Sequence, residues 1–301
     1  ASQSARRGPG QDVPPTVTST AIALVLLSTL LHTAWNSAAK QADDKLLFLT
    51  WLLPVCALIA LPGALAAYSL GGRLSWPAIA AALTSATLWS ICYQATAKAY
   101  EGGDLSVMYP LMRGTTPLLT ALMCLRTEPP TPAGWVALVL ITVAVVLLSG
   151  GDKRVERPTN VALAAGVLVA LITALYAVVD AWGVRHGNQL MYMLVENAAS
   201  AVLLMTWVSR QRGAAAVRDF GRAYRRPLVL AAFGSYGAYG LVLLALQQAP
   251  VAYVTALRAT AVLWSVLYGC LALREPALRR RLLYGSLMVL GVVLLKLWGT
   301  G

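Results

Sequence analysis

Charged side chains are scarce in this sequence. Only 12% of its 301 residues are Asp, Glu, Lys or Arg, whereas 58% are hydrophobic, and the mean hydropathy is +0.66. Soluble domains carry about 25% charged and about 45–50% apolar residues. The shortage of charge excludes an ordinary soluble domain and predicts an all-α integral membrane protein.

Histidine and cysteine are also rare. The two histidines, His32 and His186, are expected at opposite membrane edges, and no close cysteine pair has metal-ligand spacing. The four cysteines lie inside apolar runs, where they are expected as small core residues: Cys56, Cys92, Cys124 and Cys270. We therefore expect no metal and no cofactor. The lack of a Ser/His/Asp arrangement or a metal-ligand spacing also argues against an enzyme.

Acidic residues are half as common as basic ones, 12 against 24, which gives a net charge of +12. The basic residues cluster between apolar runs, so they are expected to set membrane topology rather than to bind nucleic acid. Outside two arginines within the spans, sixteen lie on one expected face and six on the face that holds the N-terminus. The positive-inside rule then predicts both termini outside the cytoplasm.

Long apolar runs dominate the rest of the chain. A helix crosses the hydrocarbon core in about 20 residues, with a range of about 17–25. We expect a disordered tail at residues 1–17, and ten runs after it are long enough to span. Pro110 and Pro117 are expected to bend the fourth of these runs, at residues 105–125. The short connections leave no room for a separate catalytic domain. The predicted spans are 18–39, 46–70, 76–99, 105–125, 133–149, 160–183, 189–208, 227–248, 251–273 and 282–298.

The two halves of the chain repeat one another. Arg113, inside Leu111-Met-Arg-Gly-Thr-Thr-Pro-Leu118, aligns with Arg258, inside Ala256-Leu-Arg-Ala-Thr-Ala-Val-Leu263, and each run is followed by Glu-Pro, at Glu128 and Glu275. Five spans per repeat is an odd number, so the copies must enter the bilayer in opposite orientations. We expect inverted repeats at 18–150 and 159–299, joined by a linker at 151–158.

This arrangement resembles the drug/metabolite transporter superfamily, EamA type. The likeness covers residues 18–298 and depends on the span count, the repeat and the two Glu-Pro endings. It implies a transporter of small metabolites with a central cavity lined by spans 1, 3, 4, 6, 8 and 9. It also implies both termini inside the cytoplasm, against the charge count. The superfamily handles amino acids, drugs, sugar nucleotides and phosphorylated sugars, so it leaves the substrate open.

Arg113 and Arg258 are the first candidate site residues. A charge at the centre of a membrane helix costs about 2.5–3.5 kcal/mol on insertion scales, so each should face protein or water. Either they bind a substrate anion, which guanidinium groups hold bidentately, or they lock helices together. By helix rise, Arg258 and Glu196 lie at a similar depth and can pair, with Asp180 nearby. We expect no acid at the depth of Arg113, which makes it the main candidate contact for an anion.

The remaining candidates are polar or aromatic residues within the spans. Glu196 and its neighbour Asn197 either contact a substrate ammonium or a proton, or form a fixed ion pair with Arg258. His32 and Asn36 share one helix face, with Trp35 beside it, and either line the cavity or bond helices together. Aromatic candidates complete the lining: Tyr93, Tyr109, Tyr176, Tyr236 and Tyr239.

The pattern as a whole predicts a secondary active transporter of a small polar or amphipathic metabolite in a bacterial-type inner membrane. An amino acid or organic anion is the expected substrate, export the expected direction, and alternating access the expected mechanism. Membrane lipids and coupled protons are the expected partners, and a monomer is plausible. The alternatives are a flippase for a lipid or lipid-linked precursor, a multidrug exporter, and a membrane scaffold or receptor.

Overall fold

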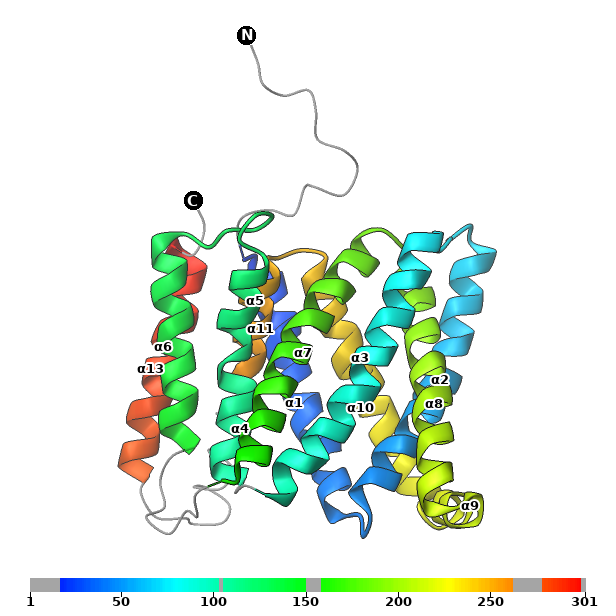
Figure 1. Cartoon of the computed structure of the whole chain (residues 1–301). Coiled ribbons are helices and arrows are strands. Elements are labelled where there is room, and N and C mark those ends of the chain that lie inside the picture. The colour runs from blue at the N-terminus through cyan, green and yellow to red at the C-terminus, as the bar shows by residue number, and fades with distance from the viewer. Residues whose placement is uncertain (1–16, 103–104, 150–157, 262–277, 299–301) are drawn as a thin grey trace.

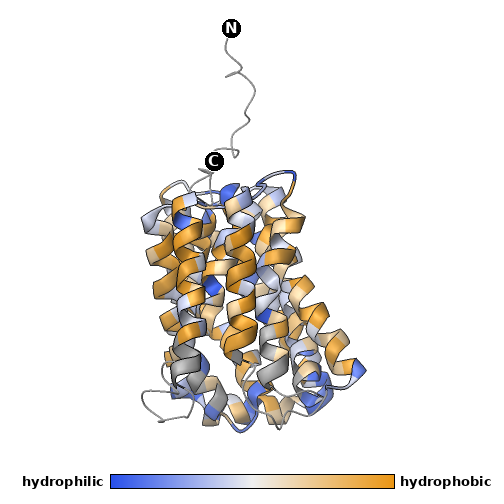
Figure 2. Cartoon of the chain, turned by 90° about the vertical axis from the view of Figure 1, so that its left-hand side faces the viewer, coloured by the Kyte–Doolittle hydropathy of each residue, from blue (hydrophilic) through white to orange (hydrophobic). Residues whose placement is uncertain are grey.

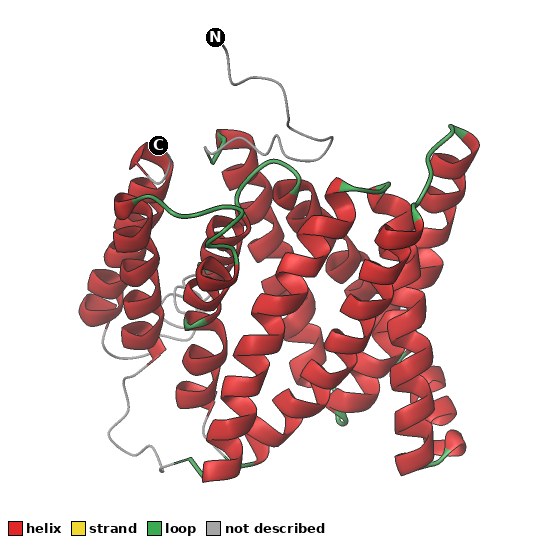
Figure 3. Ribbon diagram, turned by 45° about the horizontal axis from the view of Figure 1, so that its top comes forward, coloured by secondary structure: helices red, strands yellow, loops and turns green. Residues whose placement is uncertain are grey.

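The computed structural model describes residues 17–102, 105–149, 158–261 and 278–298, and these form α-helices with no β-strand (Figures 1 and 3). The expectation of an all-α chain is therefore confirmed for the described residues. The helices are α1 (Ser19–Gln41), α2 (Lys45–Ser69), α3 (Trp76–Glu101), α4 (Leu105–Gly114), α5 (Thr116–Met123), α6 (Pro132–Ser149), α7 (Asn160–Arg185), α8 (Gln189–Arg212), α9 (Ala214–Ala223), α10 (Arg225–Leu246), α11 (Val251–Ala259) and α13 (Leu278–Trp298).

The helices have the length and surface of membrane spans. Among the described residues, α1, α2, α7, α8 and α10 are long and apolar enough to cross a membrane, and α6 and α13 contain shorter apolar helices. Large apolar side chains lie exposed on the outside, including Leu58, Val161 and Leu230 at 68%, 69% and 75% exposure. Figure 2 shows these apolar faces between polar ends of the bundle. An outer surface of this kind suits lipid, so the chain is a multi-pass membrane protein.

Local sequence sets where the helices begin. Thr18, Asp44, Ser75, Thr159 and Asn188 each precede a helix, and each side chain accepts a hydrogen bond from a backbone N–H of the first turn. Such N-caps satisfy donors that have no partner within the helix. These boundaries agree with the predicted spans to within a few residues.

The predicted fourth span is interrupted at Thr115, where α4 ends and α5 begins. Pro117 lies in the first turn of α5 and has no N–H to donate to the preceding turn. The carbonyl of Gly114 instead accepts a hydrogen bond of 2.8 Å from Thr142 on α6. The proline therefore breaks the helix, and a hydroxyl from a neighbouring helix satisfies the backbone at the break.

Helices from the two halves of the chain alternate in the bundle. α3 packs most extensively against α7, α1 against α10, α2 against α8 and α6 against α13. The start of α1 and the end of α13 lie at one end, the upper end in Figure 1, and α9 lies across the lower end near α8. The core therefore forms between the two halves rather than within each.

Part of the predicted second repeat lies outside the described residues. The ninth span is described as far as Ala261, so the rest of it and the Glu275-Pro276 ending belong to the undescribed stretch 262–277. Most of the linker predicted at 151–158 is also outside the described residues. The repeat boundaries and the count of ten spans therefore stay predictions.

Candidate functional site

Two acidic side chains are buried side by side between the helices. Asp180 on α7 is completely buried and accepts hydrogen bonds from two tyrosine hydroxyls, Tyr192 on α8 at 2.8 Å and Tyr239 on α10. Glu196 on α8 is 4% exposed, and Ser85 on α3 donates to its Oε1 at 3.3 Å. We call Asp180 and Glu196 the buried acid pair. The two acids and their hydrogen-bond partners come from four helices, α3, α7, α8 and α10, so only tertiary packing assembles the pair.

One of the four carboxylate oxygens of the buried acid pair, Oε2 of Glu196, has fewer hydrogen-bond partners than the other three. Glu196 Oε2 and the indole Nε1 of Trp89 lie within electrostatic reach of each other. Both atoms are buried, yet neither makes a hydrogen bond of normal geometry with the residues that the structure describes. Unsatisfied polar atoms in a protein interior are rare and mark sites of function or of missing ligands.

Trp89, which was not among the predicted site residues, is at the centre of an aromatic cluster with three tyrosines that were. Its ring stacks on Tyr176 with centroids 4.6 Å apart, and it contacts Tyr93 and Tyr239 at 5.5 and 5.6 Å. Ser85, Trp89 and Tyr93 recur every four residues along α3 and so share one face. That spacing is the signal in the sequence that points to Ser85 and Trp89 as site residues.

Arg258 on α11 lies beside the acid pair without direct contact. Its guanidinium carbon is 5.6 Å from the centroid of Tyr239, in a cation–π arrangement. No ion pair of 4 Å or less joins it to Glu196 within the described part of the chain, although its charge acts on both acids. The predicted close ion pair between Glu196 and Arg258 is therefore a longer-range electrostatic interaction. The ring of Tyr239, rather than the carboxylate, lies against the guanidinium of Arg258.

Arg113 on α4 belongs to the same polar centre. It is half-buried, and its charge acts on Tyr93, Tyr176 and His32. His32 on α1 and Tyr176 on α7 are also within reach of Arg258. The two arginines, which we call the central arginines, are therefore brought to a common region by helices from both halves of the chain.

The other predicted site residues lie around this centre or apart from it. His32 and Trp35 meet edge to face at 5.0 Å, and Asn36 is half-buried on the next turn of α1. Asn197 donates to the carbonyl of Met193 in its own helix, at 2.8 Å. Tyr236 packs toward α1 and α2. Tyr109 lies on α4, but its side chain is outside the described part of the structure.

An ion-pair cluster closes the upper end of the bundle, above the acid pair. Arg185 at the end of α7 pairs with Glu128, whose other oxygen accepts a 2.8 Å hydrogen bond from the backbone N–H of Val251. Arg185 also donates to the carbonyls of Leu246 and Ala249 at 2.8 and 3.0 Å. We call Glu128 and Arg185 the upper closure. It joins the segment between α5 and α6 of the first half to α7, α10 and α11 of the second.

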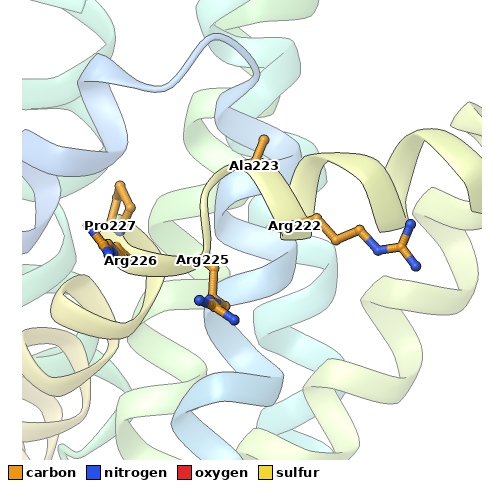
Figure 4. Close-up of a pocket in the computed structure, with 5 residues that line it drawn as sticks. All are labelled: Arg222, Ala223, Arg225, Arg226 and Pro227. Atoms are coloured by element: carbon orange, nitrogen blue, oxygen red, sulfur yellow. The ribbon is translucent and has the colours of Figure 1, made fainter.

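A separate pocket lies at the lower surface, between the end of α9 and the start of α10 (Figure 4). The side chains of Arg222 and Arg225 point in different directions. Tyr239 follows Arg225 by fourteen residues on α10, a rise of roughly 21 Å. The pocket is therefore remote from the polar centre. Its lining residues are Arg222, Ala223, Arg225, Arg226 and Pro227.

Apolar spans around a buried polar centre define a polytopic membrane protein with an internal site, and comparison with known proteins agrees. The model of the EamA-like transporter family matches residues 160–297. The match confirms the resemblance to the drug/metabolite transporter superfamily, EamA type, over the second half of the chain. This family implies a membrane transporter.

The fold is also found among solved structures, 28 chains of which match. One crystal structure has a TM-score of 0.69 and 16% sequence identity, and the match covers 93% of this chain and 98% of that one. At that identity the likeness shows the fold alone. No curated protein matches the chain in sequence. Within the described residues, no group of three His, Cys, Asp or Glu side chains could hold a metal ion.

Proposed function

We propose that this protein is a secondary active transporter that exports a small polar or amphipathic metabolite, an amino acid or organic anion, across a bacterial-type inner membrane. The observation that carries the proposal is that the charges of both Arg113 and Arg258 act on His32 and on Tyr176. A guanidinium is permanently charged and holds a carboxylate or phosphate through two parallel hydrogen bonds. Two such groups inside a membrane bundle favour a substrate with an anionic group.

The aromatic cluster supports the amphipathic character of that substrate. Trp89, Tyr93, Tyr176 and Tyr239 present ring faces and polar tips beside the central arginines. Rings of this type bind apolar groups by contact and orient polar groups through hydrogen bonds. We propose that they receive the organic part of the substrate while the arginines hold its anionic end.

Alternating access between two inverted five-span repeats is the mechanism we propose. If the halves correspond, α1 matches α7, α2 matches α8, α3 matches α10 and α6 matches α13. Exchanging the halves then turns the α3–α7 contact into the α10–α1 contact and leaves the α2–α8 and α6–α13 contacts unchanged. Exchange of this kind is expected of a pseudo-twofold axis, and it supports ten spans that rock about a central site.

Ligand-induced thermal stabilisation of the purified protein tests the proposal. Amino acids, organic acids, phosphorylated metabolites, lipids and cationic drugs would be compared on the wild type, Arg113→Gln and Arg258→Gln. Arg126→Gln, at an exposed arginine outside the bundle centre, is the matched control. We expect an anionic or zwitterionic class to stabilise the wild type and the control, and to lose its effect in either central variant.

Two results would contradict the proposal. Stabilisation of all four proteins alike would show that the central arginines hold helices together rather than substrate. Stabilisation by lipids or cationic drugs alone would favour a flippase or a multidrug exporter, the alternatives with the same fold.

A further inference from the structure

The buried acid pair places two carboxyl groups together in the interior of the bundle. Asp180 and Glu196 act on each other electrostatically, and Ser85 interacts with both carboxylates. Both side chains are more than nine-tenths buried. Two carboxylates placed this close in a low-dielectric interior cannot both stay ionised at small cost.

Arg258 is a cation whose charge acts on both acids. The neutral groups that face the pair come from several helices: Cys56 on α2, Ser85 and Trp89 on α3, Tyr176 on α7, Tyr192 on α8 and Tyr239 on α10. Neutral groups do not offset the repulsion between two ionised carboxylates in a low-dielectric interior.

We propose that Asp180 and Glu196 form one proton-binding site, in which the two carboxylates share a single exchangeable proton. Uptake of that proton from water changes the charge of the pair from −2 to −1 and removes the repulsion between two ionised carboxylates. The hydroxyls of Tyr192, Tyr239 and Ser85 already donate to three of the four carboxylate oxygens. Glu196 Oε2 is the fourth oxygen, and it makes no such bond.

The position of the pair connects this proton to the movement of the helices. The Ser85–Glu196 hydrogen bond joins α3 in the first half to α8 in the second, and the upper closure lies roughly 10 Å above it. Relative movement of the halves would change the donors around the pair and its access to water, and so the affinity for the proton. This coupling rests on the proposed transport function, whereas the proton site itself does not.

Infrared difference spectroscopy of the purified protein tests the proton site without any substrate. Spectra would be recorded between about pH 5 and about pH 9, the range over which buried carboxyl groups titrate. We expect the wild type to show one titrating C=O band of a protonated carboxylic acid. That band should shift or vanish in Glu196→Gln and in Asp180→Asn, and be absent from the double variant. Asp219→Asn, at an exposed acid on α9, is the matched control and should keep the band.

Two further variants keep both carboxyl groups in case the acid variants do not fold. Tyr192→Phe and Tyr239→Phe each remove one hydroxyl that donates to Asp180. Each should move the frequency of the band, because hydrogen bonding changes the stretch of the carboxyl group. A wild type without a titrating band, a band that persists in the double variant, or a frequency unchanged in both Phe variants would overturn the proposal. Failure to find a transported metabolite would contradict the proposed function and leave this result intact.

Discussion

Gly183 on α7 provides the space that the ring of Tyr192 on α8 fills. A Cβ atom at position 183 would overlap the Cε2 and Cζ atoms of that ring. Tyr192 is completely buried, and its hydroxyl donates to Asp180 less than one turn before the glycine. Because Gly183 has no side chain, the ring of Tyr192 can lie against α7, where its hydroxyl donates to the carboxylate of Asp180.

Gly183→Ala should destabilise the protein, because neither the buried ring nor the helix can move without losing packing. Overpacking of a buried site typically costs about 1–3 kcal/mol, and we expect a lower midpoint of thermal unfolding in detergent. Gly237→Ala on α10 is the control, since its Cβ would meet Leu31 at an ordinary 3.7 Å. Equal stability of the two variants would contradict the close packing of Gly183 and Tyr192.

Glu128→Ala should loosen the upper closure. Arg185 would keep its bonds to two backbone carbonyls but lose its acid, and the N–H of Val251 would lose its acceptor. Cys124, which is 2% exposed and one turn before Glu128, reports the opening through its rate of reaction with a maleimide. In a background without the other three cysteines, we expect labelling to become faster by on the order of tenfold, which corresponds to about 1.4 kcal/mol.

The control for this experiment is Asp219→Ala, at the lower end of the bundle, which should leave the labelling rate of Cys124 unchanged. If Glu128→Ala and the wild type reacted at the same rate, Glu128 would not hold the upper end closed.

Tyr224, between α9 and α10, should ionise at unusually high pH. Its hydroxyl donates to the carboxylate of Asp43 at 2.7 Å, and this hydrogen bond raises the pKa of Tyr224 above its ordinary value of about 10. Because the folded state holds this proton more tightly than the unfolded state, the contact stabilises the fold below about pH 10. That stabilisation is lost as the pH rises from there through the pKa of the folded state.

Ultraviolet titration of tyrosinate, with Tyr224→Phe subtracted, measures this ionisation directly. Asp43→Asn removes the charged acceptor, so we expect Tyr224 to titrate closer to the ordinary value in that variant. Identical titration curves with and without the Asp43 carboxylate would show that the hydrogen bond does not form in solution.

The sequence predicted which charged residues lie at the polar centre of the bundle, but it did not predict which groups they contact. It identified Arg113, Arg258, Glu196 and Asp180 because a charged residue in a long apolar run is conspicuous. It placed Glu196 against Arg258 because both lie at a similar depth. Depth in the membrane is only one of three coordinates. The rotation of each helix about its axis also decides whether two side chains at the same depth touch. The structure places Tyr239 against the guanidinium of Arg258 instead.

By itself, the sequence determined that the chain is an all-helical membrane protein with an arginine inside an apolar run of each half. Hydropathy, helix caps and a helix-breaking proline act through neighbours in the chain, so they can be read without a fold. Only the tertiary structure decided that Tyr192, Tyr239 and Ser85 satisfy the buried acids and that Trp89 stacks on Tyr176. These partners lie on different helices, and their meeting depends on how helix surfaces pack, which no local pattern encodes.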